Sequence, residues 1–435
     1  MDILLSDITV ITMNEGQGKP VLMHGYVGID GRKITYVGEQ PPAESATRVI
    51  SGTRRLLMPG LVNSHSHLPM AALRGYADDY RLKEWLYEHI FPAEGKLDDR
   101  CIAAAVRLGI AECIRFGVVS CTEMYFHLPR IAEAVLETGV KANICNALLC
   151  LDMDNFDFEK DRGVMETREV LAQYKGRGDG RLVVDMGIHA EYTSGPAAWQ
   201  KSVAFAAEND LRLHIHLSET EAEHTECVQK YGKTPTEILN ANGVFSRKTT
   251  AAHCCWLTDG DMDILAAGGA TAAHCPVSNL KLSSGIAPVT RMLAHGLNVG
   301  LGTDGACSNN NHDMFEEIKT AALLQKYLTG DPSVLPAYEA IQLATVNGAV
   351  GQGRGGETGR VAVGYDADLI MLDLDAPHLF PLNDPCAAVA YSARGSDVCL
   401  TMVQGKILYE NGEYTTIDLE KIRREVETYV LPRLG

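Results

Sequence analysis

Two histidines separated by one residue are the first side chains of this sequence that could do chemistry. His65 and His67 stand at the end of an apolar run, in the segment MPGLVNSHSHLPM. Residues i and i+2 of a β-strand point to the same face, so both imidazoles are expected to face one side. Two converging imidazoles suit a divalent metal ion such as zinc. The pair alone is equally compatible with a structural or surface role.

Three further apolar runs end in residues that could bind the same ion. LRLHIHLSETE carries His214, His216 and Glu219. A strand is expected to end at His253 in TAAHC and at Asp304 in NVGLGTDG. A buried carboxylate is costly unless it is paired or binds a metal. These runs together favour a metal site over a chance set of core histidines. His214 lies deeper on its run and is interpreted as a satisfied interior histidine.

Short apolar runs alternate with longer helical stretches, and these elements must position the candidate residues. Eight candidate strands end near His67, Met124, Leu149, His189, Leu217, Cys254, Ala273 and Gly302, with helices expected over 98–116, 197–209 and 313–328. His274, near the seventh strand end, is interpreted as structural or as support for the site. Eight βα repeats predict an α/β fold of the (β/α)8 barrel type, with its active site at the carboxyl ends of the strands. A doubly wound open sheet is the alternative, but no Gly-x-Gly-x-x-Gly follows the first strand.

Both ends of the sequence are rich in short strands and turns. Asp30-Gly31 and Asn411-Gly412 are hairpin signals between such strands. We therefore predict a small β-sandwich domain formed by residues 1–57 and 360–435, around a barrel of residues 58–359. A terminal helix is expected after Asp418.

Composition narrows the kinds of partner. The net charge of -17 argues against nucleic acid and anionic membranes as partners. The 12 cysteines follow no regular framework, and the first residues lack the Lys or Arg of a signal peptide. We therefore expect a soluble, cytoplasmic protein with a small-molecule partner, and a homo-oligomer is left open.

Several ordered segments resemble one protein family. The segments PGLVNSHSH, HIHLSETE, AHC, HCPVSNLKLSSGIAP and GLGTDGACSNNNHDMFEE resemble the amidohydrolase superfamily, and within it the 5'-methylthioadenosine/S-adenosylhomocysteine deaminases. The resemblance extends from about residue 2 to beyond 410. It implies a zinc-dependent enzyme that hydrolyses an adenosine-type nucleoside to its inosine analogue and ammonia.

The resemblance assigns a single zinc ion to His65, His67, His216 and Asp304. Relatives with two metals use a carboxylated Lys or a Glu at a middle strand end. The fourth strand ends in MGIHAEYTS, which has no Lys, and Glu191 lies past the expected ligand position. One metal ion per chain is therefore expected.

The resemblance also assigns the proton transfers. Zinc lowers the pKa of a bound water to about 7. Glu219 would pass a proton from that water to N1 of the adenine ring, Asp304 would accept the second proton, and His253 would steer the water. The alternatives are a surface carboxylate at an acidic helix start for Glu219 and a core histidine for His253.

The segment RLKEWLYEHIFPAEGKL resembles the family loop that covers the nucleoside. Glu94 matches a carboxylate that accepts hydrogen bonds from the ribose 2'- and 3'-hydroxyls, and His189 matches a residue that contacts the purine. Trp85 matches an aromatic wall, although a lid-anchoring role is nearly as well supported. Relatives that accept S-adenosylhomocysteine offer arginines after the third strand. Arg162 is the nearest candidate here, and an exposed Arg at a helix start is an equally fair interpretation.

The acidic residues of this region set an expectation about substrate. They are Asp152, Asp154, Asp157, Glu159 and Asp161, with Glu191 expected near the same pocket. We therefore expect 5'-methylthioadenosine, 5'-deoxyadenosine or adenosine to be preferred over S-adenosylhomocysteine, whose tail carries a carboxylate. The alternatives are a 5'-deoxyadenosine deaminase, a guanine, cytosine or chlorotriazine hydrolase of the same superfamily, and a non-catalytic scaffold of the same fold.

Overall fold

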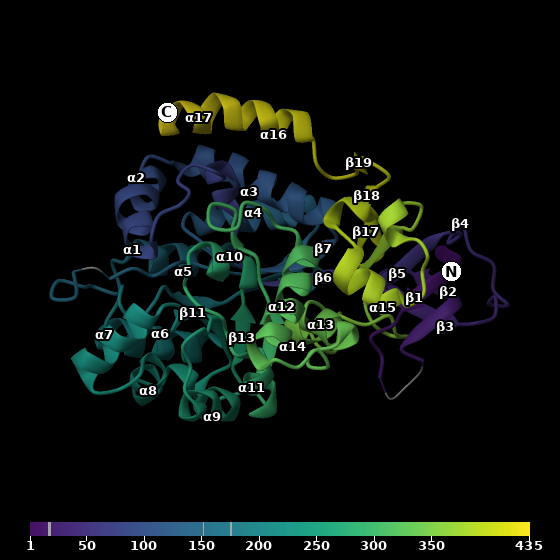
Figure 1. The fold of residues 1–435 in the computed structure, drawn as a ribbon. Helices are drawn as coiled ribbons and strands as arrows, with labels where there is room; N and C mark the ends of the chain where they lie inside the picture. The colour runs from purple at the N-terminus through teal and green to yellow at the C-terminus, as the bar shows by residue number, and fades with distance from the viewer. Residues whose placement is uncertain (16–18, 151, 175) are drawn as a thin grey trace. The chain divides into compact units, whose positions relative to one another are not determined.

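The computed structural model describes residues 1–15, 19–150, 152–174 and 176–435 (Figure 1). Their contacts divide the chain into two compact units. One unit contains Met1–Asn63, Ala111–Ser120 and Asp313–Ile417, and the other contains Ser64–Ile110, Cys121–His312 and Asp418–Gly435. The second unit holds every site residue expected from the sequence.

Parallel strands form the framework of the site. They pair in the orders β15-β6-β7-β8-β9 and β10-β11-β12-β13-β14. Their bounds are β6 Leu61–His67, β7 Val118–Met124, β8 Lys141–Cys145, β9 Leu182–Val184, β10 Met186–Ile188, β11 Leu213–Leu217, β12 Thr249–His253, β13 Thr271–His274, β14 Asn298–Leu301 and β15 Asp304–Gly305. Asp304 pairs with Ser66, which returns the strand order to β6. The predicted α/β class with parallel sheets is therefore confirmed.

Helices follow these strands along the chain (Figure 1). They include α3 Asp99–Arg115, α4 Leu128–Thr138, α5 Arg162–Tyr174, α6 Pro196–Asn209, α7 Glu221–Tyr231, α8 Pro235–Ala241, α9 Asp259–Ala267, α10 Pro276–Lys281, α11 Val289–Ala294, α12 Met314–Thr329, α13 Ala337–Leu343 and α14 Val346–Gly351. Thr234 and Thr258 begin α8 and α9 with reciprocal side-chain and backbone hydrogen bonds. Such caps satisfy the free N–H groups of a first helical turn. The three helices predicted by residue range agree with α3, α6 and α12 to within one residue.

One predicted strand end is wrong. β8 ends at Cys145 rather than near Leu149, while the other seven ends lie within one residue of the prediction. Beyond Cys145 the backbone bonds to a neighbouring loop instead of a strand. Cys150 N donates to Thr193 O at 2.8 Å, and His189 N donates to Leu148 O at 3.1 Å.

Strands from both chain ends share one hydrogen-bonded sheet. Nine strands pair in the order β19-β18-β17-β16-β5-β1-β2-β3, with β4 beside β1. Their bounds are β1 Ile3–Ile11, β2 Val21–Asp30, β3 Lys33–Gly38, β4 Arg48–Ser51, β5 Arg55–Pro59, β16 Leu369–Asp373, β17 Val398–Val403, β18 Lys406–Glu410 and β19 Glu413–Tyr414. The predicted turns at Gly31 and at Asn411-Gly412 connect β2 to β3 and β18 to β19. Leu5, Ile8 and Leu400 belong to the apolar core of this sheet.

The chain ends in a helical segment. α16 (Leu419–Glu425) begins at the predicted Asp418, whose side chain accepts from Lys421 N at 2.9 Å. A π-helical turn, η8 (Val426–Val430), and α17 (Leu431–Leu434) continue it. Among the described residues, no helix combines the length and apolar character that crossing a bilayer requires.

Candidate active site

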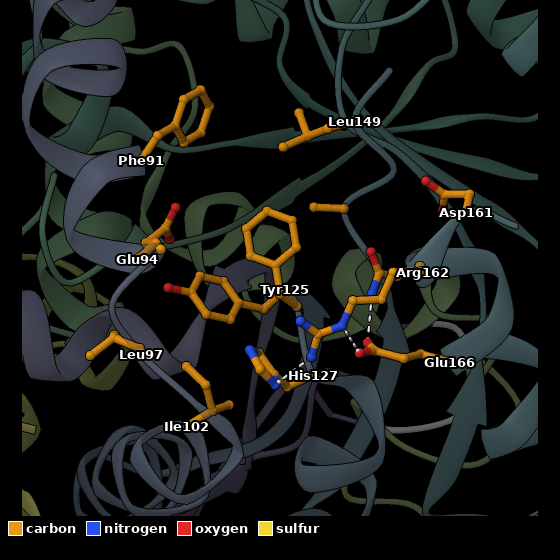
Figure 2. A pocket seen from close by; sticks show the side chains of 15 residues that line it. Phe91, Glu94, Leu97, Ile102, Tyr125, His127, Leu149, Asp161, Arg162 and Glu166 are labelled. Atoms are coloured by element: carbon orange, nitrogen blue, oxygen red, sulfur yellow. Dashed lines mark hydrogen bonds and ion pairs between the residues drawn. The ribbon is translucent and has the colours of Figure 1, made fainter. Parts of the chain in front are cut away.

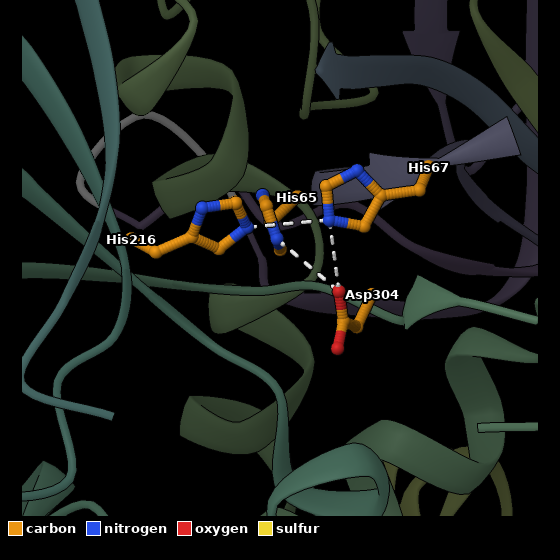
Figure 3. Close-up of side chains that lie close together, drawn as sticks. All are labelled: His65, His67, His216 and Asp304. Atoms are coloured by element: carbon orange, nitrogen blue, oxygen red, sulfur yellow. Dashed lines mark hydrogen bonds and ion pairs between the residues drawn. The ribbon is translucent and has the colours of Figure 1, made fainter. Parts of the chain in front are cut away.

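Three histidines and one aspartate converge where β6 and β11 end and β15 begins (Figure 3). His65, His67, His216 and Asp304 are buried, and each contributes one ligand atom within 4.8 Å of the others. Asp304 Oδ1 lies 3.3 Å from His65 Nε2 and 3.2 Å from His67 Nε2. The two residues of the His-x-His pair therefore face the same side, as strand alternation requires.

Backbone carbonyls determine the tautomers of two of these histidines. His67 Nδ1 lies 2.6 Å from Met124 O, and His216 Nδ1 lies 2.7 Å from His189 O. A carbonyl oxygen can only accept, so each Nδ1 carries the proton and each Nε2 directs a lone pair into the cluster. These two Nε2 atoms are 3.2 Å apart.

This donor set fits a metal ion. Two inward lone pairs beside a buried carboxylate repel one another unless a cation lies among them. Three imidazole nitrogens and one carboxylate oxygen are ligands that a divalent ion such as zinc accepts. The hydrogen bonds at each Nδ1 are the outer-shell contacts usual for metal-binding histidines.

The third histidine ligand has a different support. His65 Nδ1 lies 2.9 Å from His214 Nε2, and His214 Nδ1 lies 3.6 Å from Cys145 Sγ. If His65 directs Nε2 at the ion, its Nδ1–H donates to His214, which in turn donates to the thiol sulfur. His214 is buried, as the sequence predicts, and it also orients a residue of the cluster.

Asp304 is held from both sides. Its Oδ2 accepts from Ser278 Oγ at 2.6 Å and from Ser308 Oγ at 2.9 Å. Its backbone φ of 59° is left-handed, a conformation that costs energy for a residue with a side chain. Burial alone would raise the pKa of its carboxyl, but hydrogen bonds with His65 and His67 hold that pKa well below its usual range. The carboxylate is therefore ionised and available as a ligand.

Glu219 follows β11 on a tight turn. Ser218, immediately before it, has a φ of 47°. Glu219 Oε1 accepts from Ser284 Oγ at 2.8 Å, and Oε2 lies 3.8 Å from His253 Nε2. Burial raises the pKa of Glu219. A carboxyl with a raised pKa beside a metal-binding cluster is suited to proton transfer.

Glu223 fixes this turn from the first turn of α7. Its two carboxylate oxygens accept from Ser218 N at 2.8 Å and from Glu219 N at 2.7 Å. Burial raises the pKa of Glu223 to about 8. Because of its two hydrogen bonds, Glu223 holds in place the backbone that carries Glu219.

His253 lies at the end of β12 with a φ of 70°. Its Nδ1 is 2.9 Å from Asn279 Oδ1, and its ring stacks on His216 with centroids 5.5 Å apart. These contacts leave Nε2 directed at Glu219. His253 is thus part of the buried constellation and not an isolated core histidine.

A cavity adjoins the cluster, and we call it the inner cavity. Its lining includes His67, Trp85, Phe91, Glu94, Tyr125, Phe126, His189, Tyr192, His216, Glu219, His253 and Asp304. A second space, the outer chamber, has a volume of about 430 Å³ (Figure 2). The two share a wall formed by Phe91, Glu94, Tyr125, Phe126 and Ala147.

The residues expected to hold substrate lie in both spaces. Trp85 lines the inner cavity and also anchors the loop, because its Nε1 donates to Ala77 O at 2.9 Å. His189 lines the same cavity, and burial lowers its pKa to about 3, so the ring is neutral. Glu94, at the end of α2 (Phe91–Glu94), lies in the shared wall, and burial raises its pKa to about 7.

Arg162 lines the outer chamber and not the described inner cavity. Its Nε donates to Glu166 Oε1 at 2.7 Å, and its Nη2 lies 2.8 Å from His127 Nδ1 (Figure 2). Asp161 also lines the chamber. The guanidinium is therefore already compensated by a neighbouring carboxylate.

The structure places most of the nearby acidic residues outside the lining of the two spaces. Asp152, Asp154, Asp157 and Glu159 are exposed, and only Asp161 of the acidic segment lines the chamber; Leu151 lies outside the described residues. Glu191 is buried but is absent from the described lining of both spaces. The chain beyond β8 leaves the strand ladder, so sequence distance from the strand end did not indicate distance from the pocket.

Sequence reasoning missed several residues of the site. Asn279 and Ser284 lie in the segment HCPVSNLKLSSGIAP. Their sequence signal was that they are polar residues which follow the seventh predicted strand. Tyr125 directly follows the second strand, as His67 ends the first. Glu223 was visible only as one of several acidic residues at a helix start.

Comparison with known proteins agrees with this geometry. Residues 56–408 match the amidohydrolase family. A 5-methylthioadenosine/S-adenosylhomocysteine deaminase from Moorella thermoacetica is 42% identical over 98% of both chains. A 5'-deoxyadenosine deaminase from Methanosarcina acetivorans is 42% identical over 98% of this chain and 97% of its own. The crystal structure of an adenosine deaminase from Xanthomonas campestris with bound zinc superposes with a TM-score of 0.92, at 30% identity over 99% and 98% of the two chains.

Parallel βα units with a buried cluster of three histidines and one aspartate define a class of metal-dependent hydrolases. The chain belongs to the amidohydrolase family. As the resemblance implied, it is a metal-dependent aminohydrolase.

Proposed function

We propose that this enzyme hydrolyses the 6-amino group of an adenosine-type nucleoside, represented by 5'-methylthioadenosine, to give the inosine analogue and ammonia. One observation carries the proposal. A single cavity is lined by three residues of the metal-binding cluster (His67, His216 and Asp304) and also by Glu219, His253 and Glu94. The full-length relatives named as deaminases of adenosine analogues support the same reaction.

The metal we propose is zinc, at one ion per chain, held by His65, His67, His216 and Asp304. Bound zinc lowers the pKa of water to about 7 and so supplies the nucleophile. Elemental analysis of the purified protein should give close to one zinc per chain. A reproducible value near two, with activity that follows the second ion, would contradict this proposal.

The protein's own residues then move the protons. Glu219 takes a proton from the attacking water and delivers it to N1 of the purine, and its raised pKa suits both steps. Asp304 accepts the second proton on its way to the leaving amine. His253, stacked on His216, hydrogen-bonds the attacking water and orients it toward C6.

Residues in the walls of the inner cavity bind the nucleoside in this proposal. Glu94 accepts hydrogen bonds from the ribose hydroxyls, His189 contacts the purine, and Trp85 forms an aromatic wall. These roles are supported by the lining of the inner cavity. A free base such as guanine or cytosine has no diol for Glu94 to bind.

The 5'-substituent is proposed to enter the outer chamber, next to Arg162. Because Glu166 and Asp161 share that chamber, a tail carboxylate gains little from the guanidinium. We therefore expect 5'-methylthioadenosine, 5'-deoxyadenosine or adenosine to have a higher kcat/KM than S-adenosylhomocysteine, by roughly ten- to a hundredfold. Competition between the two classes in one vessel measures this ratio, and preference for S-adenosylhomocysteine would show that Arg162 or another basic residue binds its tail.

The finer architecture is also a proposal. We propose that the parallel strands close into a (β/α)8 barrel over residues 58–359, with a β-sandwich from 1–57 and 360–435. The pairing of β15 with β6 supports closure. A cytoplasmic location is proposed from the twelve free, buried cysteines, which suit a reducing compartment.

The test of function is a panel of candidate substrates, each followed by the change in its own ultraviolet absorbance, which for the nucleosides is the loss of adenine absorbance. 5'-Methylthioadenosine, 5'-deoxyadenosine and adenosine should be converted, while guanine, cytosine and a chlorotriazine should not. Conversion of a free base or a chlorotriazine in preference to every nucleoside would place the activity in another branch of the family. No activity on any compound by zinc-loaded protein would support a scaffold role.

A further inference from the structure

The wall shared by the two spaces contains two buried polar atoms that face each other and have no further hydrogen-bond partner among the described residues. They are the hydroxyl of Tyr125 and Oε1 of Glu94. Tyr125 is 2% exposed, and both residues line both the inner cavity and the outer chamber. Figure 2 shows the hydroxyl and the carboxylate on the same side of the chamber.

The position of Tyr125 is determined by its neighbours. Its backbone N donates to Cys145 O at 3.1 Å, one residue beyond the end of β7. Its ring lies against Phe126 and His67, with centroids 5.4 Å and 6.3 Å apart. The hydroxyl is therefore held in the wall before any ligand arrives.

Without a ligand the Tyr125 hydroxyl faces only the Glu94 carboxylate, and a ligand hydroxyl placed between the two gives each of them a hydrogen-bond partner. Ionised Glu94 can only accept, whereas the Tyr125 hydroxyl can donate. A sugar hydroxyl does both, because it gives its proton to one group and accepts from another through its oxygen. The two wall atoms are thus complementary to a hydroxyl of a ribose diol.

We propose that Tyr125 is a ribose-binding residue that acts together with Glu94. Its hydroxyl donates to the oxygen of one ribose hydroxyl while Glu94 accepts that hydroxyl's proton. The inference rests on the proposed nucleoside function and deepens it, since it predicts selection for ribonucleosides over one of the two monodeoxy analogues. A site built to bind a hydroxyl discriminates against the analogue that lacks it, because its own polar groups are left unpaired.

The test compares Tyr125→Phe with the wild-type enzyme on adenosine, 2'-deoxyadenosine and 3'-deoxyadenosine. For adenosine, kcat/KM should fall by roughly 3- to 10-fold, mainly through KM, the value of one neutral hydrogen bond. For the analogue that lacks the accepting hydroxyl, the substitution should change nothing. The wild-type preference for adenosine over that analogue should shrink by the same factor.

Two further variants separate this role from a structural one. Tyr192 also lines the inner cavity, and its ring lies 6.4 Å from that of His189. Tyr192→Phe should change kcat/KM for all three substrates by the same factor, whatever the size of that factor. In the double variant Glu94→Gln/Tyr125→Phe, the fall in kcat/KM for adenosine should be smaller than the product of the two single-variant falls, because both residues bind the same hydroxyl.

The outcomes distinguish a failure of the role given to Tyr125 from a failure of the proposed nucleoside deamination. If Tyr125→Phe lowers kcat/KM equally for all three substrates, or for none of them, Tyr125 only lines the cavity. The inference is then wrong, while the proposed nucleoside deamination is unaffected. If the wild-type enzyme converts no nucleoside, the proposed function fails and the inference fails with it. An unchanged melting temperature of each variant shows that the comparison is made on folded protein.

Discussion

At the scale of single residues, the site depends on which nitrogen of each histidine carries a proton. Met124 O and His189 O each hold an Nδ1–H, so the Nε2 atoms of His67 and His216 face the cluster. His65 alone uses a side chain, His214, for this contact. A side chain can be replaced without disturbing the backbone, which makes His65 the ligand whose support can be tested.

Glu219→Gln tests the proton transfer. The amide keeps the size of the side chain and can still accept from Ser284, but it cannot exchange protons at neutral pH. We expect full zinc content and a fall in kcat on the order of 10³. Near-normal turnover would assign the proton transfer to another group.

His214→Leu tests the support of His65. Loss of the acceptor for His65 Nδ1 should weaken zinc binding by roughly 10- to 100-fold in chelator competition. His214→Gln offers an amide oxygen near the same place and should recover part of that loss. His274→Leu is the matched control, because His274 is also a buried strand histidine but has no hydrogen-bond partner among the described residues. An equal loss of zinc affinity in His214→Leu and His274→Leu would indicate a packing effect instead of a lost hydrogen bond.

At the scale of elements, the ends of the strands carry the strained residues. Ser218, His253 and Asp304 have φ values of 47°, 70° and 59° at three different strand ends. Such backbone persists only where surrounding contacts hold it. For Ser218 that contact is the carboxylate of Glu223, which links the turn to α7.

Glu223→Gln tests this link. The amide presents an N–H group to one of two backbone N–H donors, so the turn should shift and misplace Glu219. We expect kcat to fall by roughly 10- to 100-fold with zinc content unchanged. Glu221→Gln, an exposed change in the same helical turn, should leave kcat unaffected. Loss of zinc in Glu223→Gln would instead show that α7 supports the whole cluster.

At the scale of the whole molecule, the metal site joins β6, β11 and β15, which lie far apart in the sequence. Binding of an ion to the folded state alone stabilises that state against unfolding. In the ion's absence a proton takes its place. Burial disfavours the imidazolium of His67, but the hydrogen bond and charge of Asp304 outweigh burial and raise its pKa to about 9.

Metal-free protein should therefore lose stability as the pH rises. The folded pKa of His67 lies above the value of 6.5 for an exposed histidine, so its contribution is complete below pH 6.5 and is lost as the pH rises through about 9. Glu223, with a pKa raised to about 8, changes stability in the same direction in both forms of the protein. The melting temperature of chelator-treated protein should fall more steeply from pH 6.5 to 9 than that of zinc-loaded protein. Parallel curves, or metal-free His67→Gln with an unaltered slope, would contradict this assignment.

Local sequence patterns were sufficient to predict the framework of the site. A period of two along a strand places His65 and His67 on one face, and the βα order places strand ends at one rim. For this reason the candidate residues, which also included Glu219 and His253, could be selected from their spacing, and seven strand ends could be predicted from apolar runs. The resemblance to a known family then reduced the candidates to the four residues of the cluster. The spacing and the apolar runs are local patterns, and the covalent chain imposes them before any long-range contact forms.

The hydrogen-bond partners of the side chains, in contrast, depend on the three-dimensional fold. His214 and His274 look alike in the sequence, yet only His214 meets a cluster residue, because a hydrogen bond depends on rotamers and on a partner from another strand. The pairing of Arg162 with Glu166 and the absence of Glu191 from the described pocket lining follow from the path of loops beyond the strand ladder. No periodicity governs such loops, since their backbone bonds are made to distant segments. The placement of Tyr125 beside Glu94, in the wall between two cavities, likewise depends on the packing of segments that are distant in the sequence.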